Sequence, residues 1–286
     1  LIRNPFPAIP ITSTWSDQPF FKQIFQEELL YLEKTIKNQL NKNLKILYIL
    51  GERGCGKSAL LKFFLREVCS SFKKLTPIYA KLGSSHSFTP LYNSAISWLG
   101  NDFIHKLCLR RFSRGILHGR FSDFIWDPSR AYVNLIFEGD RAKFPVFIML
   151  LNMIRDDSKV LLGIDGLDNI FEGLSQMQRI DIIYGFNRLI DGVGEDIILF
   201  LTINNHILRW LKINRVTLES LNIRSLFSEP EVLLIKRLNL AKARELIIQF
   251  LKMYRIRDSF MDELFPFTEN AIRLIHEASD ELQPNR

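Results

Sequence analysis

The stretch from Gly51 to Ser58 combines glycines, a lysine and a hydroxyl group at a spacing suited to holding phosphate. It reads Gly-Glu-Arg-Gly-Cys-Gly-Lys-Ser and matches the pattern G-x-x-x-x-G-K-[ST]. The glycines let the backbone curl so that its N–H groups converge on phosphate oxygens, and a helix starting near Lys57 directs its positive end at the same anion. The residues expected to contact the nucleotide are Gly51, Glu52, Arg53, Gly54, Cys55, Gly56, Lys57, Ser58 and Ala59.

Lys57 and Ser58 indicate which nucleotide chemistry the loop supports. The Lys57 ammonium group is expected to reach the β- and γ-phosphates, and the Ser58 hydroxyl is expected to ligate Mg²⁺. An apolar run from Ile46 to Leu50 precedes the loop, and a helical pattern over 57–72 follows it. This strand, glycine-rich turn and helix form the context in which such a loop works. The sequence therefore predicts binding of ATP with Mg²⁺.

A second carboxylate is expected at the end of another buried strand, where it would hold the water shell of the metal. The apolar run Val160–Ile164 is followed directly by Asp165, which we predict to fill this role. Many ATPases of this kind carry glutamate at the next position to polarise the attacking water, but this chain has Gly166. Asp168 is the nearest carboxylate that could substitute. The alternative is that Asp168 only caps a helix after the strand.

Another apolar run, Ile197–Ile203, is followed by Asn204 and Asn205. Ligands of open parallel sheets lie at the carboxyl ends of the strands, so polar residues here are candidates for phosphate contact. Thr202 or Asn204 is expected to hydrogen-bond the γ-phosphate or the attacking water. The alternative is a strand end that simply enters an asparagine-rich turn.

The alternation of apolar runs and helical patterns predicts the elements that position these residues. Further strands are expected over 76–82 and 232–235, and helices over 20–40, 88–100, 144–156, 176–191 and 206–213. Strands that alternate with helices predict an α/β fold with a doubly wound, mostly parallel sheet. From 239 onward the pattern is helical only, with pieces over 239–254, 258–265 and 268–279. We predict an extended lead-in over 1–20, a nucleotide-binding domain over 21–237 and a helical lid over 238–286.

The composition is that of a globular intracellular protein with moderate positive charge. The formal net charge is +7 and the three cysteines have irregular spacing, which disfavours a disulfide framework or a cysteine metal site. No apolar run reaches membrane-spanning length and no signal peptide is visible, so no membrane partner is expected. We predict a cytoplasmic or nuclear protein in a reducing compartment.

One stretch, from Phe103 to Ser122, concentrates positive charge and contains no acidic residue. Basic side chains near aromatic rings suit contact with phosphates and stacking on bases. The candidate nucleic-acid contacts are Lys106, Arg110, Arg111, Arg114 and Arg120. The alternative is a solvated basic helix whose phenylalanines fill the core.

Taken together, these motifs resemble the AAA+ and STAND branches of the P-loop ATPases. The Asn4-Pro5-Phe6 opening, the long helix and the phosphate loop look like the origin-recognition initiators and the related transposition-regulator ATPases, and 265–273 is similar to their last lid helix. The resemblance implies a switch ATPase that assembles on DNA as a homo-oligomer when ATP is bound. It also implies an arginine that reaches a neighbouring subunit, for which Arg224 and Arg215 are candidates, and a lid arginine, for which Arg286 is the candidate.

The sequence departs from the initiator pattern at Asp165-Gly166-Leu167-Asp168, which looks more like a STAND (NACHT-type) signalling ATPase. In that alternative, nucleotide exchange controls assembly and the partners are proteins. A processive motor or a metabolic kinase is disfavoured, because neither an adjacent catalytic glutamate nor a site for an acceptor substrate is evident. Without that glutamate, hydrolysis is expected to be slow and to increase on assembly or DNA binding.

Overall fold

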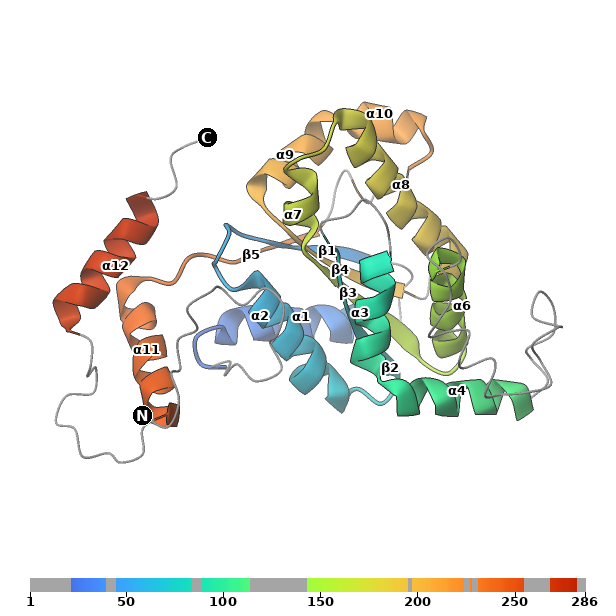
Figure 1. Cartoon of the computed structure of the whole chain (residues 1–286), viewed down its shortest axis with the longest axis horizontal. Helices are drawn as coiled ribbons and strands as arrows, with labels where there is room; N and C mark the ends of the chain where they lie inside the picture. Colours follow the sequence, from blue (N-terminus) through green and yellow to red (C-terminus); the bar gives the residue numbers. More distant parts are fainter. Residues whose placement is uncertain are drawn as a thin grey trace. The chain divides into compact units, whose positions relative to one another are not determined.

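Figure 1 shows the computed structural model of the chain, which describes residues 22–39, 45–83, 89–113, 143–194, 197–223, 227, 231–254 and 268–281. The chain divides into two compact units, of which one is Tyr31–Ile235 and the other joins Leu1–Leu30 to Lys236–Arg286. The extended segment expected over 1–20 and the helix expected over 258–265 lie outside the described residues. The domain limits at 20/21 and 237/238 remain sequence-based predictions.

The unit Tyr31–Ile235 is built on a parallel sheet of five strands, arranged in the order β2-β3-β4-β1-β5. The strands are β1 (Lys45–Leu50), β2 (Leu75–Lys81), β3 (Lys159–Asp165), β4 (Ile197–Ile203) and β5 (Glu231–Leu234). Each end lies within one residue of the end predicted from the sequence. The order places β4 between the strand that enters the phosphate loop and the strand that ends at Asp165.

An N-terminal helix precedes β1, and the helices between the strands run along both faces of the sheet. The elements are α1 (Gln26–Gln39), α2 (Lys57–Phe63), α3 (Thr89–Leu99), α4 (Asn101–Ser113), α6 (Lys143–Arg155), α7 (Leu167–Phe171), α8 (Gln176–Val193), α9 (Asn205–Ile213) and α10 (Arg215–Ser220). A π-helical turn (Phe64–Val68) and a 3₁₀ turn (Cys69–Ser71) extend α2. The α7 and α10 helices are too short to produce a periodic pattern, and the sequence analysis did not predict them.

The connections explain why the sheet is wound on both faces. The chain crosses from β1 to β2 in one direction and then returns through β3 and β4, and right-handed crossovers in opposite directions place their helices on opposite faces. In Figure 1, α2 lies on one side of the sheet and α7, α8 and α9 lie on the other. The predicted doubly wound α/β fold is therefore confirmed.

The central strands β1, β3 and β4 are buried on both faces, which is why they read as continuous apolar runs, whereas the edge strands β2 and β5 are partly exposed. In β1, Ile46, Tyr48 and Leu50 belong to the core cluster shared with the helices α3, α6, α8 and α9. The alternate side chains face α2 and the π-helical turn that follows it, where the ring of Phe64 stacks on Phe200 of β4 at a centroid distance of 6.0 Å. Every residue of β4 is buried. This core fixes the carboxyl edge of the sheet, where the candidate site lies.

The other unit contains α11 (Leu240–Tyr254) and α12 (Glu269–Glu281), which match two of the three expected lid helices. Ile248 of α11 and Ile272 of α12 are buried against each other. Near the start of α11, the Lys242 ammonium group donates a hydrogen bond of 3.2 Å to the carbonyl of Ile24. Residues 22–30 belong to the same unit as α11 and α12. Two amphipathic helices that bury one face against each other are a typical small helical unit.

Candidate nucleotide site

The phosphate loop leaves β1 at Gly51 and ends where α2 begins at Lys57. Gly54 and Gly56 have φ angles of 84° and 98°, in the left-handed region that residues with a side chain rarely adopt. A Cβ atom at Gly51 would lie 2.5 Å from the Cys55 sulfur and 2.8 Å from the Ile235 carbonyl oxygen. The glycines of the motif are therefore required by backbone conformation and by close packing.

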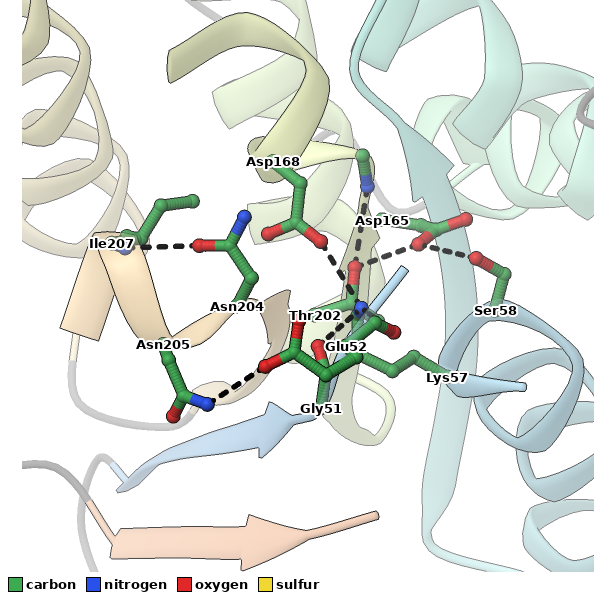
Figure 2. Close-up of polar contacts among 11 residues, drawn as sticks. Gly51, Glu52, Lys57, Ser58, Asp165, Asp168, Thr202, Asn204, Asn205 and Ile207 are labelled. Carbon is green, nitrogen blue, oxygen red and sulfur yellow. Dashed lines mark hydrogen bonds and ion pairs between the residues drawn. The ribbon is translucent and has the colours of Figure 1, made fainter. Parts of the chain in front are cut away.

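Lys57 is the charged centre of the loop and only 7% of it is exposed. Its ammonium group donates to the carbonyls of Gly51 (2.7 Å) and Glu52 (3.0 Å), and it pairs with the carboxylate of Asp168 at 3.1 Å. These contacts are drawn in Figure 2. The lysine thus folds back on its own loop, and in this structure Asp168 contacts it as an anionic phosphate would.

Ser58 and Asp165 lie together although they are far apart in the sequence. The Ser58 hydroxyl donates to Oδ1 of Asp165 at 2.9 Å, and the Thr202 hydroxyl donates to the same oxygen at 2.7 Å. Thr202 also accepts a hydrogen bond of 3.2 Å from the backbone N–H of Gly166 (Figure 2). The ends of β3 and β4 and the start of α2 therefore converge on one carboxylate, which is 5% exposed.

Asp168 lies in the first turn of α7, but the structure gives it no capping role. The N-cap of α7 is Gly166, at φ 90° and ψ 17°, and no side chain caps this helix. Burial raises the pKa of the Asp168 carboxyl group, although Lys57 and a backbone hydrogen bond from Asn204 partly offset the shift. Its Oδ1 is buried and lacks a hydrogen-bond partner among the described residues. The group is thus poorly solvated and directed at the loop lysine.

The conformation of Gly166 explains why a carboxylate is missing at the position after Asp165. A glutamate there would adopt a left-handed backbone conformation, which is costly for a residue with a Cβ atom. The turn from β3 into α7 therefore favours glycine, and the next acidic side chain falls at Asp168.

Asn204 serves as the N-cap of α9, since its Oδ1 accepts a hydrogen bond of 3.0 Å from the backbone N–H of Ile207. Its predicted role at the γ-phosphate would fall to the other end of the amide, Nδ2, which Figure 2 shows on the side of Asp168. The neighbouring Asn205 donates 3.0 Å to the Glu52 carboxylate and so links α9 to the phosphate loop. Sequence reasoning gave Asn205 no role, because a turn asparagine carries no pattern of its own.

Tyr79 of β2 is a second residue that sequence reasoning missed. Its hydroxyl donates to Oδ2 of Asp165 at 2.7 Å, and burial raises its pKa. A tyrosine within a strand is a common core residue, so its sequence position alone gives no signal. Only the pairing of β2 with β3 brings it to the carboxylate.

The remaining loop residues have lesser roles in this structure. The Arg53 side chain is exposed, while Cys55 is buried and its thiol pKa is raised by that burial. Ala59 is half-buried in the first turn of α2. Arg224, named as the arginine that reaches a neighbour, and Arg286, named as the lid arginine, lie outside the described residues. The competing Arg215 pairs with Glu219 at 2.9 Å on α10.

The basic stretch is described only in part. Lys106 and Arg110 are exposed on α4, and Arg110 pairs with Asp157 at 3.5 Å. Arg111 belongs to the same helix. Arg114 and Arg120 lie outside the described residues. An exposed ion pair of this length contributes little stability, so it would not prevent Arg110 from contacting a phosphate.

The donor types at Ser58 and Asp165 fit Mg²⁺, because this cation prefers hydroxyl, carboxylate and water oxygens. Among the residues that the structure describes, no group of three histidine, cysteine or acidic side chains is placed to hold a metal. Protein sites for Mg²⁺ commonly supply one or two oxygens and leave the rest to waters and substrate phosphates. The site therefore suits a cation that arrives with a nucleotide.

Comparisons with known proteins support the fold. No protein-family model matches this chain, and no curated protein matches it by sequence. Among solved structures, the ORC2 protein of Aeropyrum pernix in its ADPNP–ADP complexes gives a TM-score of 0.52 at 12% identity, over 87% of this chain and 57% of its own. Cdc6p of Pyrobaculum aerophilum gives 0.53 at 15% identity, over 92% and 56%.

These similarities show a fold like that of ORC2 and Cdc6p, in agreement with the α/β fold and the likeness to the origin-recognition initiators that the motifs predicted. The chain spans less than two thirds of those two proteins. In the described part of the chain, no helix combines the length and the apolar character needed to cross a membrane.

Proposed function

We propose that this protein is a switch ATPase that binds ATP with Mg²⁺, hydrolyses it slowly and assembles on DNA. The observation that carries the proposal is the convergence of Lys57, Ser58 and Asp165 at the carboxyl edge of a parallel sheet (Figure 2). Ligands of such sheets bind at this edge, and a lysine at a helix start beside a hydroxyl and a carboxylate suits a metal-bound triphosphate.

These contacts indicate which residue would bind the phosphates and which would bind the metal. The N–H groups of the loop and the start of α2 would hold the phosphates, with Lys57 as the fixed positive charge. Ser58 would ligate Mg²⁺, and Asp165 would hold the metal's water shell. When bound, the cation neutralises charge that develops on the phosphates. The chain's own residues would orient the nucleotide, and the hydroxyls of Ser58 and Thr202 orient the Asp165 carboxylate.

Slow hydrolysis follows from the placement of the second carboxylate. Asp168 is the acidic residue next along the chain after the position of the missing glutamate, but its carboxylate forms an ion pair with Lys57 at 3.1 Å. Asp168 could act on water only after the phosphates have replaced it as the partner of the Lys57 ammonium group. An arginine supplied by a neighbouring subunit, with Arg224 as the candidate, would be absent from a monomer and is worth roughly 10³–10⁵ in rate. Assembly as a homo-oligomer is therefore expected to accelerate turnover.

The DNA-binding part of the proposal rests on charge and on the fold. The net charge of +7 and the exposed Lys106 and Arg110 on α4 would attract a phosphate backbone. The fold is similar to that of ORC2 and Cdc6p, and the resemblance of the sequence motifs to the origin-recognition initiators implies assembly on DNA. We propose a cytoplasmic or nuclear location for such a protein.

The nucleotide assignment is tested by titrating ATP into the protein in a calorimeter. Lys57→Ala should weaken ATP binding at least about tenfold, because the phosphates lose a charge-assisted partner, while circular dichroism shows a folded chain. Lys73→Ala removes an exposed lysine that precedes β2, away from the loop, and should bind within about twofold of the parent. Equal ATP affinity for the parent and Lys57→Ala would refute the site.

The DNA assignment is tested by fluorescence anisotropy with labelled duplex DNA, measured with ATP, with ADP and without nucleotide over a range of salt concentrations. ATP should tighten binding, and affinity should fall with salt as counterion release requires. If the parent binds no DNA in ATP but forms ATP-dependent oligomers, the DNA role fails and the STAND-type alternative with protein partners is favoured. The sequence Asp165-Gly166-Leu167-Asp168 is the feature that supports this second candidate.

A further inference from the structure

The tyrosine beside the metal carboxylate occupies a constrained place in the sheet. Tyr79 of β2 is paired in register with Gly163 of β3, and Asp165 lies two residues beyond that glycine. Because successive side chains of a strand alternate between faces, Gly163 and Asp165 share one face. A Cβ atom at Gly163 would lie 2.6 Å from Leu65 and 2.9 Å from Leu61, so leucines pack directly on that face, and the in-register Tyr79 extends its hydroxyl diagonally to the Asp165 carboxylate.

The ring of Tyr79 is held from two sides. The indole of Trp98 on α3 packs against it with centroids 5.6 Å apart, and the Lys62 ammonium group lies 4.7 Å from its centroid. Trp98 is itself anchored by a hydrogen bond of 3.0 Å from its indole N–H to the Pro77 carbonyl. Tyr79 is 5% exposed, so its hydroxyl has a defined direction.

The Asp165 carboxylate accepts hydrogen bonds from three hydroxyl groups. Oδ1 accepts from Ser58 (2.9 Å) and from Thr202 (2.7 Å), and Oδ2 accepts from Tyr79 (2.7 Å). Thr202 accepts from Gly166, so its own proton is available for the carboxylate. A carboxylate has about four acceptor positions. Three are occupied by these hydroxyls, and the one that remains is on Oδ2.

We propose that Tyr79 is a positioning residue for the metal site: it fixes the plane of Asp165 so that a single Oδ2 lone pair faces a metal-bound water. This inference rests on the proposed function, because it concerns how ATP-bound Mg²⁺ is held. Two effects of the hydroxyl oppose each other. It withdraws charge from the carboxylate, which weakens attraction for a cation, and it orients the carboxylate, which strengthens binding. Loss of such outer partners commonly costs about 10–100-fold in metal affinity, so orientation is expected to dominate.

The experiment compares Tyr79→Phe with the parent and with Tyr48→Phe. Tyr48 of β1 is also buried, and its hydroxyl donates to the Phe227 carbonyl rather than to Asp165. Mn²⁺ is titrated into each protein in complex with ADP, and electron paramagnetic resonance measures the free ion. Tyr79→Phe should bind Mn²⁺ about tenfold more weakly, which corresponds to about 1.4 kcal/mol. Tyr48→Phe should match the parent.

Binding of ADP in the presence of EDTA separates this inference from the proposed function. Parent and Tyr79→Phe should then bind ADP equally, because the phosphate loop is intact. Unchanged or tighter Mn²⁺ binding by Tyr79→Phe would overturn the positioning role and leave the nucleotide site standing. A parent that binds neither ADP nor Mn²⁺–ADP would instead overturn the proposed function.

A measurement on the parent keeps the inference testable if Tyr79→Phe does not fold. A buried hydroxyl proton that is hydrogen-bonded to a carboxylate exchanges slowly with solvent and can be observed by proton nuclear magnetic resonance. The Tyr79 hydroxyl proton should be visible in the ADP complex and should persist when Mg²⁺ is added. Its disappearance on addition of Mg²⁺ would show that the metal-bound state breaks the contact with Asp165, and the inference would fail.

Discussion

Replacing Asp168 by asparagine should tighten ATP binding and slow ATP hydrolysis, two changes of opposite sign in one variant. The carboxylate pairs with the Lys57 ammonium group at 3.1 Å, and burial raises its pKa, so its charge is poorly solvated. A triphosphate must share that lysine with Asp168 or displace it. Asparagine keeps the size of the side chain and removes the competing charge.

The size of the effect follows from the separation of the charges. A phosphate oxygen bound to Lys57 opposite Asp168 would lie roughly 5–6 Å from the carboxylate, which corresponds to about 3 kcal/mol per pair of unit charges at an effective dielectric of about 20. The lysine and the metal offset much of this repulsion. We expect about 1.4 kcal/mol to remain, so ATP should bind about tenfold more tightly.

The assay is calorimetric titration of ATP at several pH values, combined with a phosphate-release measurement. Asp181→Asn, an exposed aspartate on α8, is the matched control and should behave like the parent. As the pH falls towards the raised pKa of Asp168, the affinity of the parent should approach that of Asp168→Asn, because protonation removes the same charge.

Two outcomes would refute this reasoning. Weaker ATP binding by Asp168→Asn would mean that the carboxylate holds Lys57 ready for phosphate rather than competing with it. An unchanged hydrolysis rate would remove Asp168 from the catalytic step and leave its ion pair with Lys57 as its role.

Two further predictions concern surface charge and pH. Lys106→Ala with Arg110→Ala should flatten the dependence of log DNA affinity on log salt by about 1.4–1.8, at about 0.7–0.9 per lost phosphate contact, and the exposed pair Lys34→Ala with Lys37→Ala on α1 should leave the slope unchanged. Burial lowers the pKa of Lys62 from 10.5 to about 8, so below pH 8 the folded protein carries a charge that the unfolded chain solvates better. Lys62→Met should therefore raise the free energy of unfolding by about 1 kcal/mol at pH 7, a value already reduced because the side chain is partly exposed. The gain should vanish above about pH 10.5, where the lysine is neutral in both states. Urea unfolding of parent and variant at pH 7 and above about pH 10.5 measures this, and an equal gain at both pH values would contradict it.

The sequence alone predicted the local parts of this protein well. The strands appear as apolar runs because parallel strands are buried on both faces, and their ends were correct to within one residue. The phosphate loop was predicted as a unit because its glycines, Lys57 and Ser58 are contiguous. Short helices such as α7 and α10 were missed, because five or six residues carry no periodicity.

The tertiary structure decided which of the candidate side chains meet. Asp168 was expected either to act on water or to cap a helix; the structure gives it no capping contact and shows an ion pair with Lys57 that the sequence did not predict, while its action on water stays a prediction. Tyr79 reaches Asp165 across 86 positions of sequence, and Asn205 reaches Glu52 across 153. These contacts depend on the strand order β2-β3-β4-β1-β5. Composition and periodicity describe each strand but say nothing about its neighbour or register, and only packing of the whole sheet sets these.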